Sequence, residues 1–120
     1  MTDTVPGTSA PIFHGSAARD DLEDWGPLDE ATGPEMHTSG LTLWSGDDGA
    51  EAGIWECTPG PSKWTLETNE LVHVLAGSMT VTPDGGAPTD VGAGDAILFP
   101  RGWTGTWEIH ETLRKVYAIF

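Results

Sequence analysis

The apolar residues of this chain occur in short runs, and glycine or proline interrupts the chain between many of them. No long stretch carries apolar residues at the three-to-four-residue spacing of an amphipathic helix. Sixteen glycines and nine prolines are scattered through the 120 residues. Such a density is typical of many short strands joined by turns, so the sequence predicts an all-β fold.

Candidate strands alternate with turn signals from residue 41 onward. The clearest turn is Pro83-Asp84-Gly85-Gly86, where glycine accepts the positive φ angles of a tight reversal. Eight short strands at close spacing suit a jelly roll, in which two sheets fold over each other and few edges stay open. The predicted strands are Leu41–Trp44, Ala52–Thr58, Lys63–Leu66, Leu71–Leu75, Ser78–Thr82, Ala96–Phe99, Thr104–Ile109 and Leu113–Phe120.

Residues 1–38 have a different composition. They mix Pro, Gly, Ser, Thr and acidic residues with the isolated apolar side chains of Phe13, Leu22 and Trp25. This pattern is too sparse for an independent core. We therefore predict an extended acidic arm over residues 1–38, with one short helical turn around Ala17–Asp24. The isolated apolar side chains would anchor the arm on the barrel or on a neighbouring subunit.

The charge of the chain narrows the choice of partners. Nineteen acidic residues against five basic ones give a formal charge of −14, which repels phosphate backbones and anionic lipid surfaces. We expect neither nucleic acid nor membranes as partners. The N-terminal residues do not resemble a signal peptide, no segment approaches transmembrane length, and the single Cys57 excludes an intramolecular disulfide. These features predict a soluble, cytoplasmic protein.

Two segments resemble the paired motifs of the cupin superfamily. They read PGPSKWTLETNELVHVLAG from Pro59 and GDAILFPRGW from Gly94. Six residues separate Glu70 from Gly77 in the first segment, as in the first cupin motif. In the second segment, the glycine, proline and glycine positions of the second motif are filled by Gly94, Pro100 and Gly102.

Longer strings are similar to one group of small single-domain cupins, which includes the ureidoglycine aminohydrolase cupin domain and the EutQ-like proteins. These strings are WECTPG, ETNELVHVLAG, GDAILFPRGWTGTW and RKVY. The resemblance implies a cupin jelly-roll β-barrel, which we place over residues 39–120 as a single domain. Because many cupins of this kind are dimers, and the apolar residues of the arm give a reason for strand exchange, we also predict a homodimer.

The same resemblance implies where a metal would bind. Cupins hold a metal with two histidines and a glutamate from the first motif and one histidine from the second. Carried onto this chain, the glutamate is Glu70, but the first-motif histidine positions hold Trp64 and Leu66, and the second-motif position holds Gly105. A single carboxylate does not bind a catalytic divalent ion tightly. We therefore predict no metal and no other cofactor.

Two alternatives to this assignment stay open. A spacing to Glu70 that is longer by one residue would place Lys63 and Thr65 at the first-motif histidine positions, and neither is an imidazole. A nonstandard set, in which Glu70 acts with His14 and His37 of the arm, would restore a metal-dependent cupin enzyme.

Tryptophans surround Glu70 in the barrel that the resemblance implies. Indole rings bind a flat or cationic ligand by stacking and by cation–π contact, while a carboxylate accepts a hydrogen bond. We predict that this pocket binds a small organic molecule; the alternative is that the tryptophans only fill a small barrel. The residues predicted to line the pocket are Trp64, Leu66, Trp103, Gly105 and Trp107.

Lys115 and Tyr117 share one face of the last predicted strand. If that face is the interior, Lys115 would pair with Glu70, and Tyr117 would donate a hydrogen bond to a bound oxygen. An acid, an amine and a phenol in an apolar pocket suit the metal-independent acid–base chemistry of an isomerase, lyase or hydrolase. The alternatives are an ion pair with structural value only, and a ligand sensor or accessory protein without turnover.

Two further side chains receive non-catalytic interpretations. Cys57 has no histidine close to it in the sequence, so a small apolar filler is preferred to a nucleophile. Alternation along the strand places His73 on the face opposite to Glu70, away from the barrel interior.

Overall fold

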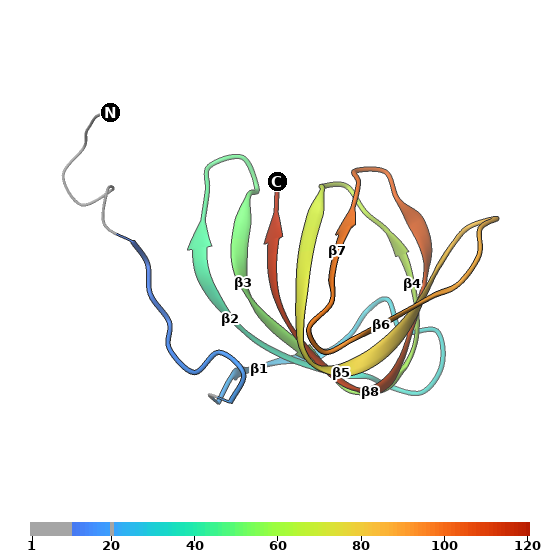
Figure 1. The fold of residues 1–120 in the computed structure, drawn as a ribbon, viewed down its shortest axis with the longest axis horizontal. Helices are drawn as coiled ribbons and strands as arrows, with labels where there is room; N and C mark the ends of the chain where they lie inside the picture. Colours follow the sequence, from blue (N-terminus) through green and yellow to red (C-terminus); the bar gives the residue numbers. More distant parts are fainter. Residues whose placement is uncertain (1–10, 20) are drawn as a thin grey trace.

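The computed structural model describes residues 11–19 and 21–120 (Figure 1). These residues form strands, turns and loops but no helix, and therefore no helix that could cross a membrane. The all-β prediction is confirmed. The strands are β1 (Glu23–Pro27), β2 (His37–Ser45), β3 (Glu51–Cys57), β4 (Gly60–Thr65), β5 (Glu70–Pro83), β6 (Thr89–Gly92), β7 (Ala96–Phe99) and β8 (Thr104–Ile119).

The long strands β5 and β8 belong to both layers of the fold (Figure 1). The strand order is β1-β2-β3-β8-β5-β6, with β4 also paired to β8 and β7 also paired to β5. The first part of β5 pairs with the last part of β8 and with β7. The last part of β5 pairs with the first part of β8 and with β6. Two antiparallel layers therefore curve around one interior, and the jelly-roll prediction is confirmed.

A glycine allows β5 to bend between the two layers. The register between β5 and β8 shifts at several points between Val74 and Met79. Gly77 lies in this stretch with a φ of 86°, and a Cβ atom there would lie 2.1 Å from the carbonyl oxygen of Thr112. Only glycine permits such a close approach of two backbones.

Four of the predicted strands form only two strands in the structure. Leu71–Leu75 and Ser78–Thr82 are parts of β5, and Thr104–Ile109 and Leu113–Phe120 are parts of β8, apart from the terminal Phe120. The predicted breaks were wrong because the chain bends at bulges, where pairing continues on both sides. Strand β6, which was not predicted, pairs with the second part of β5.

The segment predicted to be an extended arm contributes β1, which pairs with the start of β2. Residues 15–19 form a turn and strand β1 starts at Glu23, so the helical turn expected around Ala17–Asp24 is absent from its described residues. Residues 1–10 and 20 lie outside the described part of the chain. Arg114 holds the arm on the barrel, because its guanidinium donates hydrogen bonds to the Ala17 carbonyl at 3.0 Å and to Glu56 at 2.8 Å.

The apolar side chains of the arm differ in how they contact the barrel. The ring of Trp25 lies directly over Gly40 of β2, where no larger side chain would fit. Phe13, in contrast, is 88% exposed. The predicted anchoring on the barrel therefore holds for Trp25 and is not seen for Phe13, whose anchoring on a neighbouring subunit stays a prediction.

Candidate functional site

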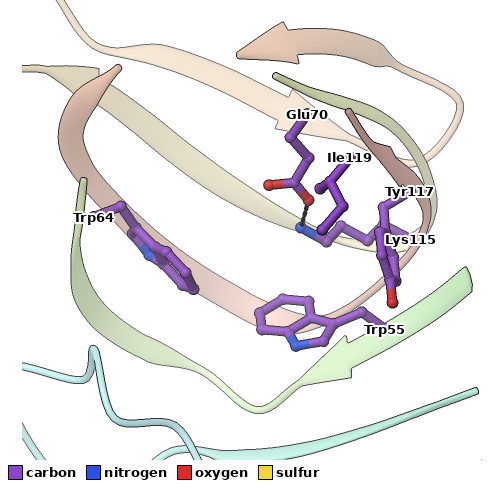
Figure 2. Close-up of a pocket in the computed structure, with 6 residues that line it drawn as sticks. All are labelled: Trp55, Trp64, Glu70, Lys115, Tyr117 and Ile119. Atoms are coloured by element: carbon purple, nitrogen blue, oxygen red, sulfur yellow. Dashed lines mark hydrogen bonds and ion pairs between the residues drawn. The ribbon is translucent and has the colours of Figure 1, made fainter. Parts of the chain in front are cut away.

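Glu70 and Lys115 form an ion pair inside the barrel (Figure 2). Glu70 is the first residue of β5, Lys115 lies on β8, and the Lys115 Nζ lies 2.6 Å from the Glu70 Oε2. Only 7% of Glu70 and 3% of Lys115 are exposed. Buried charges of this kind persist only when they are paired and hydrogen-bonded. The face of β8 that carries Lys115 and Tyr117 is therefore the interior face.

Aromatic rings surround the Lys115 ammonium. Its Nζ lies 4.5 Å from the ring centroid of Trp55, 4.6 Å from that of Trp107 and 5.9 Å from that of Tyr117. All three distances are within the range of a cation–π interaction. Of the tryptophans predicted to bind a cationic ligand, Trp107 thus already holds a cation of the chain itself.

Tyr117 is fixed by a second carboxylate. Its hydroxyl donates a hydrogen bond to the Glu51 Oε2 at 2.5 Å. Gly53, the register partner of Tyr117 on β3, leaves room for the phenol, since a Cβ atom there would lie 3.0 Å from the hydroxyl oxygen. Burial, and then the hydrogen bond to Glu51, raise the pKa of Tyr117 well above its ordinary value of 10.0. The phenol therefore stays protonated at neutral pH and acts as a hydrogen-bond donor.

These side chains border a cavity of about 90 Å³ that is partly open to solvent. Figure 2 shows Trp64 on one side of it, Trp55 below, and Glu70 with Lys115 opposite Trp64. Of the residues predicted to form the site, Trp64, Glu70, Lys115 and Tyr117 are brought together here. The complete lining is Trp55, Trp64, Glu70, Lys115, Tyr117 and Ile119.

The other predicted pocket residues pack around the cavity without lining it. Trp107 is 1% exposed and stacks on Trp64 with ring centroids 4.4 Å apart, so it supports the wall from behind. Trp103 packs its ring against Phe99 at 5.0 Å. Gly105 gives Trp103 room, because a Cβ atom at Gly105 would lie 2.5 Å from its ring.

Leu66 is half-buried and packs against the core cluster. Its backbone joins the loop after β7, because its amide donates to the Trp103 carbonyl at 2.9 Å and its carbonyl accepts from the Gly102 amide at 2.8 Å. The prediction that Leu66, Trp103, Gly105 and Trp107 contact a ligand directly is therefore not met by the lining of this cavity.

Two residues that line the cavity, Trp55 and Ile119, were not among the predicted site residues. Trp55 faces the cavity because its register partner on β8 is Lys115. Ile119 shares the interior face of β8 with Lys115 and Tyr117; the period of two along the strand places it on that face, but it was not predicted to line the pocket. Trp55 has a weaker signal, because the pairing of β3 with β8 joins two distant parts of the sequence.

The orientation of Trp64 is set by a buried hydroxyl. The Trp64 Nε1 donates to the Ser62 Oγ at 2.8 Å, and the Ser62 hydroxyl donates to the Trp107 carbonyl at 3.2 Å. Ser62 itself is buried. The indole of Trp107 differs, because its buried Nε1 has no hydrogen-bond partner among the described residues. The wall of the cavity is thus held by one directed hydrogen bond and by ring stacking.

The residues around Glu70 do not fit a divalent metal ion. The carboxylate holds the Lys115 ammonium, and the positions equivalent to the cupin histidines carry no metal ligand. Across residues 11–19 and 21–120, no three His, Cys, Asp or Glu side chains are grouped closely enough to hold a metal. His37 pairs with Asp24 at 2.8 Å, and His73 is exposed on the outer face of the sheet.

Cys57 is a buried thiol beside the site. Burial raises its pKa to about 11, although the positive charge of Lys115 acts in the opposite direction. A thiol with such a pKa remains protonated at neutral pH, and the thiolate is the reactive form. The structure thus favours the interpretation of Cys57 as a packing residue.

Solved structures share this fold. A DUF861-family protein of unknown function from Pseudomonas syringae pv. tomato has a TM-score of 0.77 and 20% identity, covering 86% of this chain and 46% of its own. This chain therefore spans less than half of that relative. Clostridium difficile EutQ has a TM-score of 0.69 and 19% identity, and the match covers 84% of this chain and 80% of EutQ. The polyketide cyclase RemF from Streptomyces resistomycificus has a TM-score of 0.62 and 24% identity, and the match covers 82% of this chain and 73% of RemF.

At these identities the structural likeness shows the fold alone. No curated protein matches the sequence at a significant level. The EutQ-like cupin domain matches residues 44–117, which include every residue that lines the cavity except Ile119. The chain belongs to the EutQ-like cupin family.

Proposed function

We propose that this protein binds a small neutral organic molecule in the cavity beside Trp55 and Trp64, and that the Glu70–Lys115 pair acts on that molecule by acid–base chemistry. The observation that supports the proposal is the position of the pair: it is buried, and yet it borders a cavity. An ion pair that only stabilised the barrel would need no such space beside it. Tyr117 completes the polar set.

The charges of the site favour a neutral ligand. The charges of Glu70 and Lys115 cancel, and Glu51 adds a carboxylate next to Tyr117. An anion would meet two carboxylates and a chain of formal charge −14. A cation would meet the Lys115 ammonium, which already occupies the aromatic surface. A neutral molecule with one acceptor and one donor can instead bridge the ammonium and the carboxylate.

The size and the walls of the cavity restrict the ligand further. A cavity of about 90 Å³ accepts only a few non-hydrogen atoms beyond the opening. The indoles of Trp55 and Trp64 supply flat apolar surfaces. We expect a small ring or a short chain that carries a carbonyl or hydroxyl oxygen.

The polar groups suit catalysis without a metal. In an isomerase, lyase or hydrolase of this kind, Glu70 would accept a proton, and Lys115 would stabilise negative charge on a substrate oxygen. The polyketide cyclase RemF shares the fold, so this scaffold carries catalysis in at least one neighbour. A ligand sensor without turnover is the second candidate, because the charges of Glu70 and Lys115 are already paired with each other.

Ligand binding tests the proposal. A panel of small neutral amides, ketones, aldehydes and sugars is added to the purified protein, and binding is followed by tryptophan fluorescence and thermal shift. We expect saturable binding that weakens about tenfold in Glu70→Gln and is unchanged in Glu108→Gln, an exposed carboxylate of β8. Product analysis by mass spectrometry then separates an enzyme from a sensor. Equal binding by both variants would contradict the proposed site.

A further inference from the structure

Lys115 differs from the other lysine of the chain in its surroundings. The sequence contains only two lysines, Lys63 and Lys115. The side chain of Lys63 is 45% exposed and pairs with Asp84 at the surface. Lys115 is almost completely buried, but its side chain borders the cavity. An amine in such a place is shielded from bulk water and is accessible only to molecules that enter the cavity.

The contacts of Lys115 leave its nitrogen partly unsatisfied by hydrogen bonds. One ammonium proton is donated to Glu70. The Nζ otherwise lies against the faces of Trp55 and Trp107, which attract a cation but accept no strong hydrogen bond. If the shared proton moves along the 2.6 Å hydrogen bond to Glu70, both buried charges disappear together. The neutral amine then has a free electron pair inside an apolar cavity.

We infer that Lys115 is a nucleophile that forms a Schiff base with a small aldehyde or ketone in this cavity. The inference rests on the proposed function, because the carbonyl compound must enter the same cavity. It goes further by naming the substrate class and the covalent bond. Desolvation in an apolar pocket is a recognised way to activate a lysine for attack on a carbonyl carbon, and Glu70 is the base that would take its proton.

Lys115 and Glu70 together account for every proton that the reaction transfers. Glu70 takes one proton from the Lys115 ammonium, and the neutral amine attacks the carbonyl carbon to form a carbinolamine. As the C–O bond breaks, Glu70 returns its proton to the departing oxygen, which has received its other proton from the nitrogen. Water leaves and a protonated imine remains, paired with the Glu70 carboxylate. The net change is loss of one water molecule, with no oxidant or reductant.

Reductive trapping tests this step on the natural 120-residue chain. Propanal, benzaldehyde and cyclohexanone are each incubated with the protein and sodium cyanoborohydride, which converts an imine into a stable secondary amine. Peptide mapping by mass spectrometry then distinguishes Lys115, Lys63 and the α-amino group. We expect Lys115 to be modified about tenfold faster than Lys63 by at least one probe, although Lys63 is far more exposed. The rate should saturate as the probe concentration rises.

Matched variants assign the chemistry. Lys63→Arg should leave trapping at Lys115 unchanged, and Lys115→Arg should remove it. Glu70→Gln should slow it about 100-fold, because the glutamine carries no proton between nitrogen and oxygen. If Lys115→Arg does not fold, the modified peptide of the natural chain identifies the site by itself.

The outcomes separate the inference from the proposed function. Saturable binding of the probes by tryptophan fluorescence, with modification only at Lys63 and the α-amino group, would overturn the Schiff base and leave the binding site intact. Modification of Lys115 that rises linearly with probe concentration, at the rate of Lys63, would also overturn it. If no probe binds saturably and no probe is trapped, both the Schiff base and the proposed binding site are overturned.

Discussion

Glu51 and Glu70 lie on opposite sides of Ile119, because both are its register partners, one on β3 and the other on β5. Each carboxylate holds a different donor from β8: Glu51 accepts from the Tyr117 hydroxyl, and Glu70 accepts from the Lys115 ammonium. The site therefore contains two separate acid–donor pairs, whose roles can be distinguished by changing one carboxylate at a time.

The Glu51–Tyr117 pair predicts a pH titration. Tyr117 is the single tyrosine of the chain, so phenolate absorbance reports on it alone. Because burial and Glu51 raise its pKa, the phenolate of the folded protein should form only well above pH 10. In Glu51→Gln the carboxylate contribution is lost, and the phenolate should form at lower pH. Ultraviolet absorbance titration of the folded protein measures phenolate formation in the natural chain and in Glu51→Gln. Identical curves for the two would show that Glu51 does not act on Tyr117.

The Glu70–Lys115 pair predicts a non-additive stability change. Glu70→Gln leaves a buried ammonium without its counter-charge, which should lower the free energy of unfolding by about 3 kcal/mol. Replacing both residues, as Glu70→Gln with Lys115→Met, removes the unpaired charge and should restore part of that loss. Urea denaturation followed by tryptophan fluorescence measures the cycle. Additive losses in the double variant would mean that the pair is not coupled.

Replacing each of two glycines with positive φ by alanine should lower the free energy of unfolding by different amounts. Gly77→Ala would place a methyl group against the Thr112 carbonyl, whereas the methyl group of Gly85→Ala would have no neighbouring atom within 4 Å. Both substitutions impose backbone strain of about 1 kcal/mol. Only Gly77→Ala must also move β8 away from β5, so we expect a loss of about 3 kcal/mol or more in the free energy of unfolding. Similar losses in the two variants would contradict the close contact.

The buried thiol predicts slow chemical modification. Since burial raises the pKa of Cys57 to about 11, little thiolate exists near pH 8. A disulfide reagent such as 5,5′-dithiobis(2-nitrobenzoic acid) should react rapidly in urea and at least about 100 times more slowly with the folded protein. Fast reaction under native conditions would show that the core around Cys57 opens easily.

Exposed apolar residues support the prediction of a homodimer. Leu71 and Leu98 are register partners on β5 and β7 and are 49% and 54% exposed, and the arm exposes Ile12 and Phe13. One chain thus offers an apolar sheet face and an apolar arm that a second copy could cover. Light scattering should give twice the 12.7 kDa chain mass, and Leu71→Asp should shift it toward the monomer. A monomeric natural chain would contradict this prediction.

Alternation of side chains made much of the site predictable. It placed Lys115 and Tyr117 on one face of the last strand and His73 on the outer face, as the structure has them. It could not identify which face of β8 is interior, because that depends on pairing with β3 and β5. It also could not separate Trp64, which borders the cavity, from Trp107, which stacks behind it.

Glycine was the source of the main error in the fold. Gly77 follows an apolar run and resembles the end of a strand, but in the structure it lets β5 bend while pairing continues. Turn and bulge use the same residue for the same reason, which is the freedom of its φ angle. Only the distant partner, β8, decides between them.

The sharing of β5 and β8 by both layers has a consequence for how the molecule unfolds. Neither layer can lose its strands without removing the partners of the other, so the barrel should behave as one cooperative unit without a stable half. Glu70 and Lys115 lie on these two shared strands. The two strands that carry the ion pair are therefore expected to separate only when the whole barrel unfolds.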